Sequence, residues 1–317
     1  IVTDVSNKET QNSVIGFDGQ MRFWGSSSIS AWYSQVNDDQ FEKPSQASMI
    51  KVDLKNDRYF FTAGQHRVDK DFDPALGFVQ RNDMVGTGAI MGFTPRVGNG
   101  EELVRQMRYT LYLRDVKNLE GISETGIVNV GVDAIFESRD RVGLKIIQER
   151  EKLLKGFTLG NGLEIQKGNY RDRKISLSAR TNQSRGYWGN FNFSKGDYFG
   201  GNKTSWNTSI GRQFSNHLTL YGSANQNIIF MPNQGEFTAN IYGFTAEVAL
   251  NREWFGKALI QYDNFSNQLQ LYCRINWIHT PGSDLFIVIN RLYDMSGKDN
   301  SLVQNTQVVK LTYLFQI

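Results

Sequence analysis

The sequence predicts an all-β protein, specifically a transmembrane antiparallel up-and-down β-barrel. Segments in which apolar and polar residues alternate recur along the chain, whereas none shows the 3.6-residue period of an amphipathic helix. Aromatic residues make up 13% of the chain, and 30 Gly stand against only 5 Pro, which favours strands joined by tight turns. No run of about 18 apolar residues is present, so no transmembrane helix is expected.

The expected strands number about 17, and each has roughly the 9 to 11 residues that cross a bilayer when a strand is tilted. No helix-length segment separates them, which favours an up-and-down barrel over a doubly wound sheet. The strands are expected at residues 14–24, 27–37, 47–55, 58–68, 83–96, 105–116, 122–137, 141–149, 169–181, 186–196, 204–213, 217–228, 238–250, 254–265, 268–278, 283–293 and 303–317.

Each clear segment has one apolar and one polar face, because successive strand side chains point to opposite sides. In 268–277 the apolar face contains Leu269, Leu271, Cys273, Ile275 and Trp277, and the polar face contains Gln268, Gln270, Tyr272, Arg274 and Asn276. The final segment repeats the pattern, with Val309, Leu311, Tyr313, Phe315 and Ile317 opposed by Lys310, Thr312 and Gln316.

Two architectures fit strands with two different faces. Stacked soluble sheets would turn the apolar face inward, but a closed ring of this many strands has a lumen too wide for side chains to fill. A membrane barrel turns the apolar face outward, where lipid covers it, and solvates the polar face with channel water or a plug. This second architecture is the prediction. The six Trp residues, Trp24, Trp32, Trp188, Trp206, Trp254 and Trp277, suit the aromatic girdles at the strand ends, and aromatic residues of a core would show the same pattern.

The connections between the expected strands alternate in length, as short periplasmic turns and longer outer loops do. The longer set includes residues 69–82, 197–203 and 229–237, and the alternation is weak at 97–104 and 266–267. The longest connection, 150–168, contains four Gly and is expected to be an outer loop. It could fold inward as a constriction, or contain another short hairpin.

The strand count also bears on where the barrel begins. With about 17 strands and a periplasmic end to the last one, the strand at 14–24 would start outside the cell, whereas single-chain barrels have an even number of strands. We therefore expect at least one earlier strand, with Ile1–Val5 as its end. The chain is then one barrel domain and the C-terminal part of a longer polypeptide whose intact barrel has about 18 or more strands.

Several motifs resemble a family of largely uncharacterised outer-membrane β-barrels. The motifs are Gly77-Phe78-Val79 within Asp71–Arg81, the stretch His279–Asn290, and Val308–Phe315; the early I-V-T-D and Val14–Asp18 also fit the middle of that barrel. Members of the family carry an N-terminal domain similar to family-9 carbohydrate-binding modules. The resemblance implies a membrane barrel with a saccharide-related role, and it supplies no catalytic residues.

Charge and reactive residues exclude several functions. The 35 Lys and Arg balance 32 Asp and Glu, so a nucleic-acid partner is not expected. The single Cys273 and the scattered His66, His217 and His279 predict no catalytic site, structural metal or cofactor. Ser215 lies near His217, and Ser283-Asp284 near His279, but both pairs are interpreted as turn chemistry.

One short acidic run resembles the beginning of a calcium-binding loop. Asp69, Asp71 and Asp73 alternate as the first ligands of such a loop do, but Pro74 stands where the turn Gly belongs, and Gln80 stands near the position of the closing acidic ligand. A solvated loop that binds calcium weakly at most is the prediction.

The polar faces suggest the function. The predicted lumen-lining residues could pass or hold an anionic or hydroxyl-rich solute through guanidinium, ammonium and amide groups. The alternative is a solvated interior without transport. These residues are Arg108, Tyr112, Arg114, Lys145, Arg180, Arg274 and Lys310, interspersed with Asn190, Asn192, Asn207, Asn225, Gln270 and Asn276.

Three function hypotheses follow for a barrel in the bacterial outer membrane. The first is a pore, transporter or surface-binding protein for polar solutes, possibly saccharides. The second is an anchor or scaffold within a larger envelope complex, with other envelope proteins as partners. The third is a membrane-bound hydrolase, for which no nucleophile motif of the G-x-S-x-G kind is present.

Overall fold

Over the residues that it describes, the computed structural model consists of β-strands joined by turns and loops, with a single 3₁₀ turn, η1 (Gly160–Gly162). Eighteen strands belong to one sheet, and two short ones form a separate hairpin. The chain falls into two compact units: unit 1 is residues 1–135, 144–157 and 164–175, and unit 2 is residues 136–143, 158–163 and 176–317. The structure describes residues 2–6, 11–98, 102–297 and 300–315.

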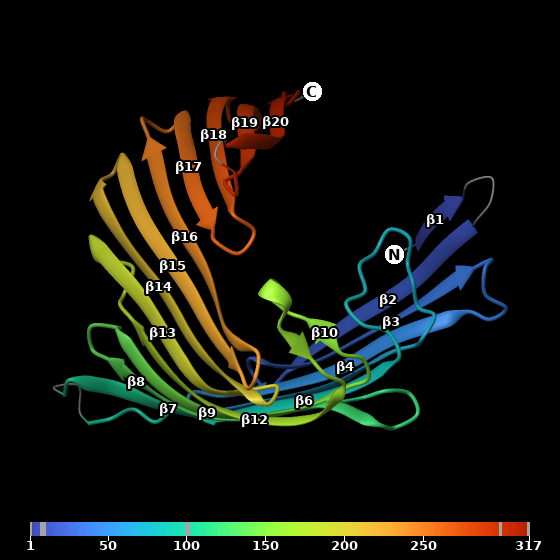
Figure 1. Cartoon of the computed structure of the whole chain (residues 1–317). Helices are drawn as coiled ribbons and strands as arrows, with labels where there is room; N and C mark the ends of the chain where they lie inside the picture. The colour runs from blue at the N-terminus through green and yellow to red at the C-terminus, as the bar shows by residue number, and fades with distance from the viewer. Residues whose placement is uncertain (1, 7–10, 99–101, 298–299, 316–317) are drawn as a thin grey trace. The chain divides into compact units, whose positions relative to one another are not determined.

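The strands follow one another along the chain as the sequence predicts (Figure 1). The first nine are β1 (Val2–Ser6), β2 (Gln11–Phe23), β3 (Ser27–Asp38), β4 (Ser45–Lys55), β5 (Tyr59–Val68), β6 (Met84–Phe93), β7 (Val104–Lys117), β8 (Ser123–Phe136) and β9 (Arg141–Leu153). The separate hairpin is β10 (Phe157–Thr158) and β11 (Glu164–Ile165). The others are β12 (Gly168–Arg180), β13 (Tyr187–Tyr198), β14 (Gly201–Ser215), β15 (Leu218–Met231), β16 (Gly235–Ala249), β17 (Trp254–Asp263), β18 (Gln268–Thr280), β19 (Ser283–Asp294) and β20 (Ser301–Thr312).

The all-β, antiparallel, up-and-down architecture is confirmed. In unit 1 each strand from β1 to β6 pairs antiparallel with the next one along the chain, and in unit 2 each strand from β13 to β19 does the same. All of the expected strands are present, and the strand expected to end at Ile1–Val5 is β1, which pairs with β2. Among the described residues, no helix has the length and hydrophobicity that a membrane crossing requires.

Two connections that the sequence predicts to be long are tight turns, so the predictions for 197–203 and 229–237 are wrong. β13 and β14 pair up to Tyr198 and Gly201, leaving a two-residue turn. Phe199 and Gly200 both have positive φ, 46° and 84°, as the favoured two-residue hairpin turns require. β15 and β16 likewise pair as far as Met231 and Gly235. The first of these turns is not recognisable from the sequence, because an aromatic residue, Phe199, is uncommon in a left-handed backbone conformation.

The last strand is shorter than predicted. β20 ends at Thr312, whereas the sequence pattern extends the strand from 303 to 317. Tyr313 and Phe315 follow the strand with their ring centroids 4.6 Å apart, and residues 316 and 317 lie outside the described part of the chain. The alternation therefore continues beyond the last backbone pairing that the structure assigns to β20.

Asp140 connects two neighbouring turns of unit 2. It accepts a hydrogen bond from the backbone N–H of Asn182 at 2.9 Å and pairs with Arg185 at 3.0 Å, while the Ser138 hydroxyl donates to it at 2.8 Å. The backbone bond from Asn182, then the Ser138 hydroxyl and the Arg185 charge, hold the pKa of this carboxyl below its ordinary value.

We expect this carboxylate to make stability depend on pH. Because its pKa is lower in the folded chain, its contribution is present above the unfolded pKa of about 3.9 and is lost as the pH falls through the folded pKa. Asp140→Asn should lower the unfolding midpoint at pH 7 and flatten its decline between pH 5 and pH 3 in urea titrations. Glu137→Gln removes the same charge from an exposed side chain in the same turn. If Glu137→Gln changes the pH dependence of the unfolding midpoint as much as Asp140→Asn does, the specific contribution of Asp140 is contradicted.

Candidate functional site

Antiparallel register places side chains of like character on the same face of each unit. Directly paired residues share a face, so one row across unit 1 contains Leu54, Phe61, Met91 and Leu111, and another contains Gln20, Ser30, Lys51, Gly64, Gly88 and Arg114. The first row belongs to what is called here the apolar face, and the second to the polar face. The predicted lumen-lining residues of β7 lie on the polar face.

The polar face of unit 1 places Arg108 on an aromatic ring. Its guanidinium carbon lies 4.8 Å from the centre of the Phe60 ring, and its Nε is buried without a hydrogen-bond partner. The Phe60 ring covers Gly92, since a Cβ at Gly92 would collide with that ring. The missing side chain of Gly92 therefore makes room for the Phe60–Arg108 stack.

The other predicted residues of unit 1 lie on this same face. Tyr112 and Arg114 share it with Arg108, because the three residues are separated by even numbers of positions along β7. Lys145 of β9 also belongs to it, because a Cβ at Gly131 would meet both its Cγ, at 3.2 Å, and the Thr110 hydroxyl, at 2.8 Å. Arg108, Arg114 and Lys145 thus form the cationic part of the unit 1 polar face, with the Tyr112 phenol on the same face.

The polar face of unit 2 is densely hydrogen-bonded around Lys257. Register aligns Glu247, Lys257 and Arg274 in one row across three strands. The Lys257 ammonium donates to the Glu247 carboxylate at 3.0 Å and to the Tyr221 hydroxyl at 2.9 Å. A carboxylate, an ammonium and a phenol thus lie within one network, which offers both donors and acceptors to a solute.

Arg274 and Lys310 converge on one aromatic ring. The Arg274 guanidinium carbon and the Lys310 nitrogen lie 5.1 and 5.7 Å from the centre of the Phe286 ring. Arg274 also donates to the Asn276 amide oxygen at 2.7 Å, which fixes the plane of the guanidinium. We call Tyr221, Glu247, Lys257, Arg274, Asn276, Phe286 and Lys310 the unit 2 wall.

Amide side chains extend this polar face across the strands. Asn192, Asn207 and Asn225 are directly paired on β13, β14 and β15. Gln270 of β18 donates to Asn290 at 3.0 Å. Arg180 lies apart from the wall, because it is exposed at the end of β12 and strands β13 to β17 stand between it and Arg274. The predicted residues therefore form two groups, one in each unit, with Arg180 outside both.

A long connection folds over the polar face of unit 1. Phe72, from residues 69–83, is buried in an apolar cluster with Val36, Ala47, Val68, Met84 and Val116, and Val79 packs against it. The Asn12 amide holds this loop by donating to the carbonyl of Asp73 at 2.9 Å and accepting from the N–H of Ala75 at 3.1 Å. Sequence reasoning missed this fold-back, although an apolar Phe72 and Val79 within a polar loop were a signal.

The 150–168 connection also folds back. It contains a short hairpin, β10–β11, which is one of the two alternatives that the sequence allowed. Residues 160–162 pack in unit 2 against Phe237 and Phe265, because a Cβ at Gly160 would collide with Phe265 and lie 2.8 Å from Phe237. Phe237 and Leu163 are buried. Phe237 shares its face of β16 with Glu247, so the tip of this loop lies on the polar face.

His217, His279 and Asp69, which the sequence interpretation assigned to turns and to a solvated loop, have structural partners. His217 Nδ1 lies 2.6 Å from the carbonyl oxygen of Ala249, and the His279 ring lies 5.3 Å from that of Trp277. Asp69 pairs with Arg67 at 3.0 Å and accepts from the N–H of Gln46, while Asp71 and Asp73 are exposed. Within the described ranges, no three His, Cys, Asp or Glu side chains are grouped as a metal site would require.

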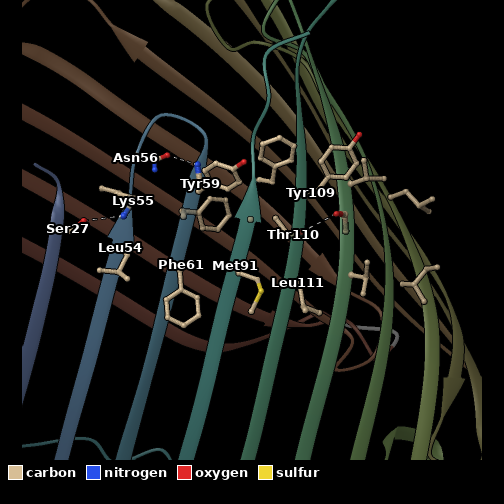
Figure 2. A pocket seen from close by; sticks show the side chains of 18 of the residues that line it. Ser27, Leu54, Lys55, Asn56, Tyr59, Phe61, Met91, Tyr109, Thr110 and Leu111 are labelled. Carbon is tan, nitrogen blue, oxygen red and sulfur yellow. Dashed lines mark hydrogen bonds between the residues drawn. The ribbon is translucent and has the colours of Figure 1, made fainter. Parts of the chain in front are cut away.

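The apolar face of unit 1 contains a depression of about 890 Å³. Figure 2 shows Leu54, Phe61, Met91 and Leu111 side by side on neighbouring strands that border it. At the strand ends, Tyr59 and Phe93 stack with centroids 5.0 Å apart, and in unit 2 Trp254 and Trp277 stack at 5.4 Å. Trp254 and Trp277 thus lie near strand ends, as the girdle prediction requires. The prediction is wrong for Trp32, which packs against the Val36 cluster on the polar face, and for Trp206, which lies in the middle of β14.

Comparison with known proteins supports the fold. No family model matches the chain, and no curated protein matches it. The structure is similar to that of the siderophore receptor PirA from Acinetobacter baumannii, with a TM-score of 0.50 and 8% identity over 97% of this chain and 72% of the receptor. A weaker similarity, with a TM-score of 0.38, is to OmpT, an outer membrane protein of Vibrio cholerae. It has 8% identity over 94% of this chain and 93% of that one. The chain has the fold of the large antiparallel outer-membrane β-barrels.

Gly92 provides a test of the Phe60–Arg108 stack. We expect Gly92→Ala to lower the free energy of unfolding by about 1–3 kcal/mol, because the new methyl group overlaps the Phe60 ring and lies 2.9 Å from the carbonyl oxygen of Tyr109. Gly19→Ala is the matched control, since a Cβ at Gly19 meets no atom within 4 Å. Gly19→Ala should leave the free energy of unfolding unchanged or raise it by up to about 1 kcal/mol. Equal losses in urea unfolding from detergent micelles would contradict the stack.

Proposed function

We propose that the chain is a bacterial outer-membrane β-barrel that binds or passes polar solutes along its polar face. The solutes would be anionic or rich in hydroxyl groups, and saccharides fit both the chemistry of the face and the partner domain implied by the sequence resemblance. The lipid bilayer would cover the apolar face. The observation that carries the proposal is the unit 2 wall, in which charged, amide and aromatic groups converge on one face.

The apolar face supports a membrane location. Phe17 and Met21 of β2 are 65% and 63% exposed, and Val309 and Leu311 of β20 are 68% and 72% exposed. Large apolar side chains exposed in contiguous rows are costly in water, whereas lipid contact removes that cost. The row of Met21 continues across the strands through Ile29, Val52, Ala63, Ala89 and Leu113, so the exposure belongs to a face and not to one strand.

The unit 2 wall has the chemistry to hold a saccharide or an anion. Arg274 presents a planar set of donors whose orientation Asn276 fixes, and Glu247 supplies acceptors beside the Lys257 ammonium. The Phe286 ring provides an apolar surface between the two cations Arg274 and Lys310. Hydroxyl groups of a sugar need donors and acceptors together, and this face contains both within one network.

The two folded-back loops would restrict access of solutes to the polar faces. The loop of residues 69–83 is held by Asn12 and by an ion pair between Arg81 and the mostly buried Glu124. The tip at 160–162 is held by aromatic contacts with Phe237 and Phe265. Each loop would restrict access to the polar face of its own unit, which suits a selective path better than a general pore. The scaffold and hydrolase hypotheses stay predictions.

We expect the wall cations to set ion preference in planar bilayers. The double variant Arg274→Gln/Lys310→Gln should lower the chloride-to-potassium permeability ratio by roughly twofold or more, because both charges lie on the solute path. The matched control Lys195→Gln/Arg252→Gln removes the same charge from exposed positions outside the wall. Reversal potentials in a salt gradient measure the ratio. An identical shift in both double variants would contradict the role of the wall.

Liposome swelling tests the solute class. Vesicles containing the chain should swell in sugars at a rate that falls with sugar size, and Gly160→Ala should change the cut-off, because it displaces the loop tip from Phe237 and Phe265. Insertion is checked by flotation with the vesicles. If inserted protein shows neither conductance nor size-dependent swelling, and sugars do not change its Trp fluorescence, the proposal is wrong.

A further inference from the structure

The apolar face of unit 1 ends abruptly along one edge. Ala89 and Leu113 are paired on it, and one step further along the same two strands the paired residues are Thr87 and Asp115. The Gln65 amide donates to Thr87 at 3.1 Å on the neighbouring strand. One step corresponds to roughly 7 Å along a strand, so the face changes from apolar to polar within that distance.

Just beyond this boundary lies a group of charged side chains, called here the rim cluster, made of Asp115, Lys117, Arg150 and Arg171. They come from β7, β9 and β12. Each shares its face with exposed apolar residues further along its own strand, namely Leu113, Ile146 and Ile175. Asp115, Arg150 and Arg171 line one depression of about 480 Å³. The rim cluster is therefore on the lipid side of the sheet, at the border of its apolar face.

The rim cluster contains three cations and one carboxylate. Arg150 Nη2 donates to Asp115 at 3.0 Å and to the Ser123 hydroxyl at 2.8 Å, while the Lys117 ammonium lies 3.7 Å from the same carboxylate. Both of these hydrogen bonds are donated by the same Arg150 nitrogen, Nη2, and they orient the guanidinium from one side. About half of the Lys117 and Arg150 side chains is exposed, and Arg171 is exposed too. The depression has a positive balance of charge at an apolar border.

We propose that the rim cluster binds the phosphate group of a membrane glycolipid that carries phosphate monoesters, with the lipid chains lying on the adjoining apolar face. The inference rests on the membrane location proposed above. A guanidinium recognises phosphate oxygens through paired hydrogen bonds, and basic residues at a membrane surface attract anionic head groups. The occupant is a lipid rather than a free anion, because the cationic depression continues directly into the Ala89–Leu113 row.

The edge that carries the rim cluster also indicates the leaflet. The loop of residues 69–83 leads into β6, whose Val85 pairs with Lys117, and the 154–167 connection follows Arg150 on β9. Long connections of single-chain barrels lie on the outside. The lipid would therefore be in the outer leaflet, where a phosphorylated glycolipid is the anionic component in Gram-negative bacteria.

The test uses the whole chain in nanodiscs and measures binding of fluorescent bisphosphorylated lipid A. Arg150→Gln/Arg171→Gln should weaken binding roughly tenfold or more, because two charged donors are lost. Asp115→Asn should tighten it, since it removes the competing carboxylate. A merely structural role for Asp115 would predict no gain. The matched control Arg58→Gln/Arg96→Gln removes two exposed charges near the opposite strand ends and should leave binding unchanged.

Further arms decide the source of the phosphate. Removing the phosphate groups from lipid A should abolish the difference between wild type and Arg150→Gln/Arg171→Gln, and inorganic phosphate should compete only weakly. Equal binding by wild type and that variant, or inorganic phosphate binding as tightly as the lipid, would overturn the proposal. Insertion is scored separately by nanodisc co-elution. A wild-type chain that does not insert would overturn both this proposal and the membrane location, whereas inserted protein with unchanged lipid binding would overturn this one alone.

Discussion

The antiparallel pairing of neighbouring strands is the constraint on which the rest of the structure depends. Pairing satisfies the backbone groups of each strand and places directly opposed residues on one face. Because side chains alternate with a period of two, a slip by one residue would move Leu111 to the polar face and Arg108 or Tyr112 to the apolar one. Such a slip would place apolar side chains on the polar face and charged side chains on the apolar face along the whole strand. The free-energy cost of both changes together fixes the register.

The polar faces show how charged residues are accommodated at such density. Cations are placed on aromatic rings, as with Arg108 on Phe60 and Arg274 on Phe286, or within a network, as with Lys257 between Glu247 and Tyr221. Ring contacts require space, and a glycine on the adjacent strand provides it beneath Phe60. These arrangements orient the charges without neutralising most of them, so the faces keep hydrogen-bond donors available.

The period-two pattern predicted the strands, their order and their faces, because these depend on local alternation. It placed Arg274 and Lys310 on a polar face correctly, but could not show that they meet on Phe286, since that depends on the register of three strands. It also missed that Phe72 of the 69–83 loop folds back and is buried against the sheet, which is a tertiary contact. The turn at Phe199-Gly200 was missed because turn propensity argues against an aromatic residue at positive φ.

The apolar face of unit 1 has chemically different ends, which gives it a direction. Tyr59, Phe93 and Tyr109 stack at one end, where uncharged amphipathic rings tolerate a range of head groups. Asp115 and Arg150 meet at the other, beside the edge from which the loop of residues 69–83 folds onto the polar face. The two ends of the face therefore differ in their side chains, and the charged end is the one from which the chain folds back over the sheet.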